Sequence, residues 1–278
     1  MARLSGNDIS KWQGKPDYEV FKKNTHFVIA KASEGTGLKD PEFVRNQSEA
    51  RRVGIPFGSY HFAKPSLGNS PEAEADWYLT AVGEIRKGEL LALDYEDNWN
   101  GDVVSWCKRF LDRLASRLNG YKALIYLNES LTNGKDWTPV VSAGHGLWIA
   151  KYANPRSPDA AYRTGKWPFA AIYQWTSEQK VPGVLNGTGN VDGNVFYGDV
   201  VTFQKYGYQP SGGQPPAEEM ITIRKAEYEA LNKQISDLSG ANKRLTDQLA
   251  LKDKECQDKL AAQKAQHAEK IRNLAGNL

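Results

Sequence analysis

Short apolar and β-branched segments recur along residues 1–209, and longer polar or amphipathic stretches separate them. This alternation is typical of βα units, because strands buried between helices are short and apolar while the connecting helices are longer and amphipathic. It disfavours a β-sandwich. The expected strands lie at 7–10, 26–33, 55–62, 90–96, 122–127, 147–152, 170–175 and 191–196.

Eight strands with helical connections predict a (β/α)8-type barrel, in which catalytic groups gather at the C-terminal ends of the strands. Helices are expected at 41–53, 71–86 and 102–118, the second with Ser70 as its cap and Pro71 in its first turn. The connections 128–146 and 177–190 are too short or too rich in glycine for full helices. We therefore expect an irregular barrel.

The barrel should occupy residues 1–209, since every aromatic residue except Tyr228 precedes position 210. Residues 210–216 (PSGGQPP) have the composition of a linker. Alanine, lysine, glutamate, glutamine and leucine then dominate 217–278, which predicts a long helix. Its apolar residues recur at seven-residue and then eleven-residue spacing. This pattern predicts a coiled-coil-like tail that forms a homo-oligomer or docks on another protein, and the alternative is a single exposed helix.

Charge and cysteine content exclude several classes of protein. The net charge is only +3, with basic and acidic residues interspersed, so nucleic-acid binding has no support. The two cysteines lack the spacing of a metal site or a disulfide framework, and we expect neither metal nor cofactor.

No apolar run approaches the ~20 residues of a membrane span. The N-terminal residues lack the apolar core of a signal peptide. We therefore expect a protein that stays in the cytoplasm after synthesis and is not exported by the usual signal.

The run LLALDYED at 90–97 carries the clearest chemical signal, because an apolar strand ends there in acid. Side chains alternate along a strand, so Asp94 and Glu96 point to the same side. Two adjacent carboxyl groups raise each other's proton affinity, which lets one remain a proton donor near neutral pH. Glycosidases need this division between one protonated and one charged carboxyl group.

Asp8 and Asp192 are expected at the ends of the first and last strands. These strands are neighbours in a closed barrel, so both residues should face the same mouth as Asp94 and Glu96. The alternative for each is a helix cap or an Asx-turn.

Six segments together resemble the successive strand motifs of the family 25 glycoside hydrolases, the Chalaropsis-type lysozymes. They are NDISKWQG (7–14), VIAKASEG (28–35), GSYHFA (58–63), LDYE (93–96), LWIAKY (147–152) and YQWTS (173–177). The resemblance implies a flattened α/β barrel that cuts peptidoglycan between N-acetylmuramic acid and N-acetylglucosamine with retention of configuration. It also implies a catalytic quartet of Asp8, Asp94, Glu96 and Asp192, with Glu96 as general acid. Asp94 either attacks the anomeric carbon or orients the acetamido group of the substrate.

Aromatic residues at strand ends fit a sugar groove, where ring faces stack on pyranose C–H groups. The candidates for substrate binding are Lys31, Tyr60, Tyr126, Trp148, Tyr152 and Trp175. The alternative for each aromatic residue is a place in the core. His61 alternates away from Tyr60 and is expected to be structural.

The tail has no aromatic-rich repeats of the kind found in wall-binding modules. Together with the expected lack of a signal peptide, this resembles a phage endolysin, which waits in the host cytoplasm until a holin opens the membrane. The partner of its tail would be a second copy or another lysis or virion protein. A virion-associated lysozyme is one alternative. The other is a wall-binding or scaffold protein that kept the barrel and lost turnover, although an intact quartet favours the enzyme.

Overall fold

The computed structural model describes residues 3–184 and 189–210, and in the C-terminal part residues 237, 240–249, 252–260, 262–264 and 266. The chain divides into two compact units, Met1–Ile221 and Thr222–Leu278.

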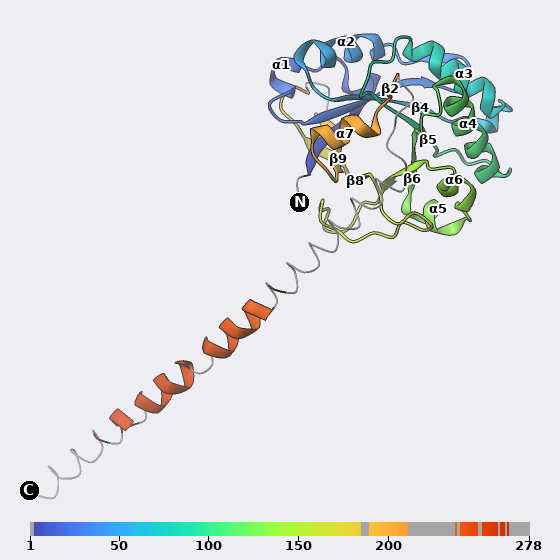
Figure 1. Ribbon diagram of the computed structural model, residues 1–278. Helices are drawn as coiled ribbons and strands as arrows, with labels where there is room; N and C mark the ends of the chain where they lie inside the picture. Colours follow the sequence, from blue (N-terminus) through green and yellow to red (C-terminus); the bar gives the residue numbers. More distant parts are fainter. Residues whose placement is uncertain are drawn as a thin grey trace, which may run out of the picture. The chain divides into compact units, whose positions relative to one another are not determined.

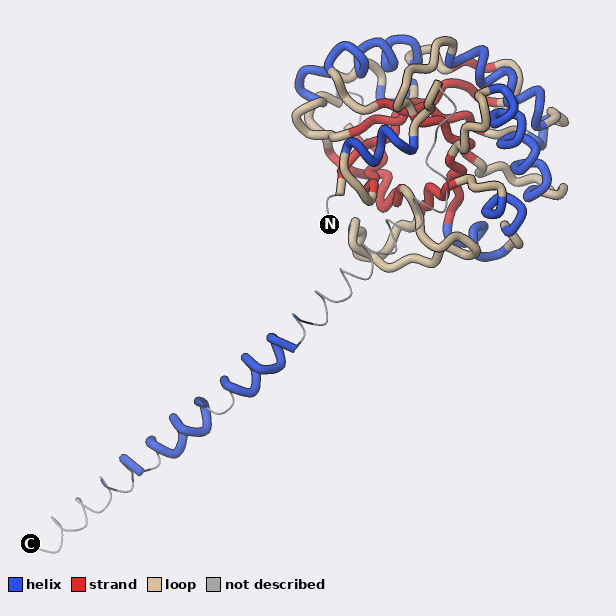
Figure 2. The backbone as a smooth tube through the Cα atoms, in the orientation of Figure 1, coloured by secondary structure: helices blue, strands red, loops and turns tan. Residues whose placement is uncertain are grey.

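Eight strands of the first unit close into a barrel, which confirms the predicted architecture (Figure 2). Their order around the barrel is β1-β9-β8-β7-β6-β5-β4-β2, and β2 pairs with β1 to close the ring. A two-residue strand, β3 (Leu38–Lys39), is added to the end of β2. The barrel strands are β1 (Leu4–Ile9), β2 (Phe27–Glu34), β4 (Phe57–Phe62), β5 (Leu90–Asp94), β6 (Leu124–Asn128), β7 (Gly146–Ala150), β8 (Ile172–Lys180) and β9 (Asn190–Phe196).

Strand β9 departs from a regular (β/α)8 barrel, because it runs antiparallel to both of its neighbours, β8 and β1. The connection 181–189 is shorter than the dozen or so residues that a parallel crossover requires, so the chain turns back directly. Asp192 consequently lies near the start of β9, whereas the sequence had placed it at the end of a strand. The reversed direction of β9 brings its start to the mouth where the other strands end.

The three long helices expected from the sequence cover the outside of the barrel (Figure 1). They are α2 (Phe43–Val53), α3 (Pro71–Val82) and α4 (Val103–Arg117). The Ser70 side chain caps α3 as expected, by accepting from the backbone N–H of Ala73. Helix α3 ends before the predicted residue 86, because Gly83 takes a positive φ of 68° and stops it. The shorter helices are η1 (Lys11–Gln13), α1 (Tyr18–Phe21), η2 (Pro65–Leu67), α5 (Glu129–Gly134), α6 (Thr138–Ser142) and α7 (Val200–Tyr206).

Helix α7 closes the end of the barrel opposite the mouth (Figure 1). Phe203 packs against Phe27, at the start of β2, and against Phe196, at the end of β9, with ring centroids 5.0 and 5.3 Å apart. These rings belong to an apolar cluster that fills the barrel interior, and a separate cluster lies between the strands and the outer helices. The aromatic rings fill the base, so among the described residues the barrel is open to a ligand at the mouth.

In the C-terminal part, the described stretches 240–249 and 252–260 are helical. Leu245, Leu249 and Leu260 are exposed there. The expected linker lies outside the described residues beyond Pro210, so the linker and the coiled coil stay predictions. Within the part of the chain that the structure describes, no helix is both long and apolar enough to cross a bilayer.

Candidate active site

Alternation along the strands decides which side chains enter the barrel. Alternate positions of each strand point inward, beginning at the base with apolar residues such as Leu4, Phe27 and Leu90. The same face carries polar groups toward the mouth. These inward positions include Asp8, Lys31, Tyr60, Asp94, Tyr126, Trp148, Gln174 and Asp192, which together line one pocket of about 250 Å³.

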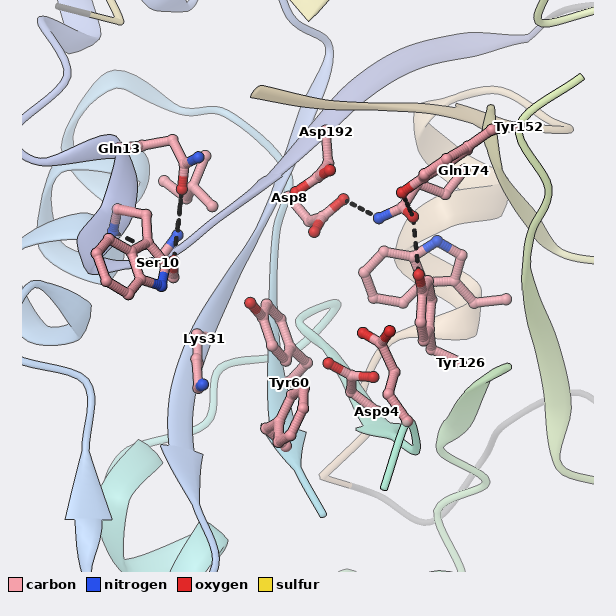
Figure 3. Close-up of a pocket in the computed structure, with 15 residues that line it drawn as sticks. Asp8, Ser10, Gln13, Lys31, Tyr60, Asp94, Tyr126, Tyr152, Gln174 and Asp192 are labelled. Carbon is pink, nitrogen blue, oxygen red and sulfur yellow. Dashed lines mark hydrogen bonds between the residues drawn. The ribbon is translucent and has the colours of Figure 1, made fainter. Parts of the chain in front are cut away.

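The four predicted acidic residues all line this pocket, three of them labelled in Figure 3. Asp94 is the last residue of β5, and Glu96 follows it two positions later. Asp8 and Asp192 are direct register partners across the β1–β9 pair. Two carboxyl pairs therefore face each other within one mouth.

The Asp94–Glu96 pair combines a buried with an exposed carboxyl group. Burial raises the pKa of Asp94 well above its usual range, and the neighbouring Glu96 and Asp8 raise it further. Desolvation also raises the pKa of Glu96, whereas its hydrogen bond to Asp94 and the Lys31 ammonium lower it. The net shift of both carboxyl groups is upward, which favours a proton on the pair. Oδ1 of Asp94 is buried and has no hydrogen-bond partner among the described residues.

Two amide side chains fix the charge of Asp8. Gln174 Nε2 and Asn194 Nδ2 both donate to Asp8 Oδ2, at 2.9 and 2.6 Å. The orientation of Asn194 is itself set by Trp148, whose indole N–H can only donate and reaches Asn194 Oδ1 at 2.8 Å. Asp8 thus accepts two N–H groups, an arrangement that favours its carboxylate form.

Asp192 is the protonated partner of Asp8. Burial raises the pKa of Asp192 to about 9, and the neighbouring Asp8 carboxylate contributes to that shift. Burial also raises the pKa of Asp8, but its amide donors limit the rise to about 6. At neutral pH the pair therefore consists of an ionised Asp8 and a neutral Asp192.

The predicted tyrosines hold this network in place. Tyr126 and Tyr152 donate from their hydroxyl groups to Gln174 Oε1 at 2.8 and 2.7 Å (Figure 3). Tyr126 also packs edge-on against Trp148, with ring centroids 5.0 Å apart. Tyr60 contacts the other side of this group, 6.3 Å from the Trp148 ring centroid. The pocket wall is therefore rigid and rich in hydroxyl groups.

Lys31 supplies the positive charge that the sequence placed near the substrate. Its ammonium pairs with Glu34 at 2.6 Å and lies 4.6 Å from the centroid of Phe62. The side chain is only 14% exposed, so the charge is held beside the pocket at a fixed position.

Trp175 was predicted to bind substrate, but it does not line the pocket. It follows Gln174 directly and so points to the opposite face of β8, where it packs against the apolar cluster outside the barrel. The neighbouring Gln174, which was not among the predicted candidates, takes the inward position. Ile172 shares that inward face.

Two further residues of the site, Asn194 and Trp12, were not among the predicted candidates. Trp12 lines the pocket, and Asn194 donates to Asp8. Asn194 interrupts an otherwise apolar strand end and is fully buried. A buried polar residue of this kind signals a satisfied network. His61, by contrast, is structural as expected, since it is buried between Ser33 and Glu74, with hydrogen bonds of 2.8 Å to each.

A barrel mouth with two carboxyl pairs, raised pKa values and a ring-lined pocket is the site of a glycoside hydrolase, which needs one carboxyl group to donate a proton and another to remain charged. The family model described as Glycosyl hydrolases family 25 matches residues 7–184. The chain belongs to this family and is a glycoside hydrolase. Asp192 lies beyond the matched segment, and its pairing with Asp8 connects it to the site.

Several known proteins are similar to this chain. Lysozyme M1 of Streptomyces globisporus is 29% identical over 214 residues, which cover 70% of this chain and 68% of that protein. The bacterial lysozyme from Streptomyces coelicolor superimposes with a TM-score of 0.61 at 25% identity, covering 77% of this chain and all of the other. The CTP1L endolysin superimposes with a TM-score of 0.59 at 26% identity, covering 74% of this chain and 70% of that structure.

Proposed function

We propose that this protein is an N-acetylmuramidase, a lysozyme that hydrolyses the β-1,4 bond between N-acetylmuramic acid and N-acetylglucosamine in peptidoglycan with net retention. The observation that carries the proposal is the Asp94–Glu96 pair, in which a buried and an exposed carboxyl group share one pocket with raised pKa values. The similarity to two proteins called lysozymes supports the choice of substrate.

Glu96 is the general acid in this proposal. It is the more exposed of the two carboxyl groups and lies at the open edge of the pocket, where a glycosidic oxygen can reach it. Desolvation raises the pKa of Glu96 above its ordinary value, which is the direction that a proton donor requires. After the first bond breaks, the same group accepts a proton from the attacking water.

Asp94 binds and orients the 2-acetamido group of the substrate in this proposal. Its buried Oδ1 lacks a hydrogen-bond partner among the described residues, and the substrate's amide N–H can supply one. Oriented in this way, the acetamide oxygen attacks the anomeric carbon and forms a cyclic intermediate. Direct attack by Asp94 is the alternative, and both routes retain configuration.

The experiment is to incubate the purified protein with peptidoglycan and to measure new reducing ends and new amino groups. We expect reducing ends to increase with time while amino groups stay constant. Release of amino groups alone would indicate an amidase, and release of neither would indicate a wall-binding or scaffold protein on the same barrel.

We further propose phage-induced host lysis as the biological setting, with the protein held in the host cytoplasm until a holin gives it access to the wall. The similarity to the CTP1L endolysin supports this setting. Expression in a bacterial host with and without a holin tests it. Lysis only when both proteins are present is expected, and lysis by this protein alone would contradict the proposed localisation.

A further inference from the structure

Trp12 is the most exposed large apolar side chain in the described barrel, at 73% of its full accessibility, and it lines the catalytic pocket. Single exposed apolar residues are common on protein surfaces and mean little alone. Trp12 differs because of its place at the pocket edge and because of the structure that holds it.

The turn that carries Trp12 is fixed at several points. Its N-terminus is closed by a capping box, in which Ser10 and Gln13 bond to each other's backbone. Figure 3 shows Ser10 and Gln13 joined in this way at the pocket edge. On one side Asp40 accepts from the backbone N–H of Lys11 at 2.9 Å, and on the other Gln13 Nε2 donates to the Asn190 carbonyl at 3.4 Å.

Such a turn presents a large ring in a fixed position. An aromatic side chain with two rotatable bonds loses little conformational entropy on binding, and a rigid backbone lowers the cost further. The Lys11 ammonium lies 5.0 Å from the ring centroid and adds a further contact to the ring. An indole ring fixed in this way is suited to stack on the C–H face of a pyranose.

The position of Trp12 separates it from the bond that is cut. Trp12 follows β1, whereas Asp94 ends β5 and Glu96 follows it, and β2 and β4 lie between β1 and β5. The pocket of about 250 Å³ is also smaller than the roughly 300–1,000 Å³ of typical ligand sites. A polymer that occupies it must continue across the rim.

We propose that Trp12 forms an outer subsite that stacks on an N-acetylhexosamine ring of the glycan strand, away from the cleaved bond. This inference rests on the proposed glycan substrate. It assigns Trp12 to strand binding and leaves the chemistry to the carboxyl pairs.

The test compares the wild-type protein with Trp12→Ala and Trp12→Phe on peptide-free glycan strands of increasing length. For Trp12→Ala we expect kcat/KM on long strands to fall about tenfold, mainly through KM, and to fall much less on the shortest oligomer cleaved. Trp12→Phe should retain most of the activity, because a smaller ring can still stack. Val44→Ala removes a similarly exposed apolar side chain from outer helix α2 and serves as the control.

Equal kcat/KM for the wild-type and Trp12→Ala proteins on long strands would overturn the proposal. So would a loss of the same size at every length, which would place the ring at the cleaved bond, and so would a loss seen only on peptide-bearing strands. Titration calorimetry with long peptide-free strands makes the test independent of turnover. Weaker binding by Trp12→Ala would support the subsite even if the protein cleaved nothing, in which case only the proposed function would fail.

Discussion

Glu96 is the residue whose removal should affect catalysis most. Glu96→Gln keeps the shape of the side chain and removes its titrating proton, so we predict that kcat on peptidoglycan falls at least about 100-fold. The side chain is exposed, so the thermal midpoint should stay near the wild-type value. Glu178→Gln changes an exposed carboxyl group on β8 outside the pocket and is the control. Near-normal turnover by Glu96→Gln would exclude the assignment of the general acid.

Asp192 should cost the folded protein stability at neutral pH. Its pKa is raised from 3.8 to about 9, so the folded state keeps a proton that the unfolded chain releases above pH 4. The stability associated with this group is fully present below pH 4 and is lost as the pH rises toward 9.

Asp192→Asn removes this dependence, and its amide can still donate to Asp8. We predict that it stabilises the protein by about 1 kcal/mol or more at pH 7, which is about 2–4 °C in Tm. The gain should shrink toward pH 4. Melting curves at several pH values check the prediction, and a variant that is less stable than wild type at pH 7 would contradict it.

At the scale of single residues, sequence patterns predicted the acidic positions better than the amide positions. Asp94 and Glu96 are visible because acid ends an apolar strand. Gln174 and Trp175 are harder to separate, since both faces of β8 carry apolar neighbours, Ile172 inside and Tyr173 outside. Hydrophobicity alone cannot assign the inner face there. The barrel register, which sets Ile172 opposite Trp148, resolves it.

At the scale of the element, the pairing of β1 with β2 depends on the absence of a side chain at Gly6. Gly6 is the register partner of Phe27, and a Cβ atom at Gly6 would lie 2.4 Å from the Phe27 ring. That ring is fully buried among Phe196 and Phe203 and cannot move away. The lower barrel therefore has no room for a further methyl group at this position.

We predict that Gly6→Ala destabilises the protein by about 1–3 kcal/mol through overpacking. Gly37→Ala is the matched control, because a Cβ there would meet no atom within 4 Å. Chemical denaturation of both variants measures the effect. Equal stability of the two would show that the base of the barrel is less tightly packed than the structure indicates.

The number and order of the strands could be predicted from the sequence, but the direction of β9 could not be read from its apolar pattern. Hydrophobic alternation is the same for parallel and antiparallel strands. The expected strands at 170–175 and 191–196 leave enough residues between them for a crossover. In the structure β8 continues to Lys180, and the remaining connection, 181–189, is too short for one. The reversal is what places Asp192 opposite Asp8.

At the scale of the whole molecule, catalysis and the C-terminal segment should be separable. Near the end of the described chain of the first unit, Tyr208 is tied to the base of the barrel. Its backbone carbonyl accepts from the N–H of Gly88, and its backbone N–H donates to the carbonyl of Glu89, both at 2.8 Å. The described tail residues Leu245, Leu249 and Leu260 are 52–65% exposed, and association would bury them. The sequence could not show what covers them, because an apolar stripe does not identify its partner.

We predict that a protein ending at Pro210 is monomeric and retains full activity on soluble glycan strands, whereas the full chain forms a dimer or larger oligomer. Sedimentation of both proteins over a range of concentrations checks this. A full chain that stays monomeric at high concentration would contradict self-association and would favour docking on another protein.

The most direct measurement for the enzyme as a whole is proton NMR of the wild-type reaction on peptide-free glycan strands, recorded as the first product forms. We predict that N-acetylmuramic acid appears at the new reducing end and that its β-anomer precedes the equilibrium mixture, as retention requires. An initial α-anomer would mean that the carboxyl groups act as an inverting pair, and a new N-acetylglucosamine reducing end would mean that a different bond is cut. Either result would contradict the mechanism proposed for Glu96 and Asp94.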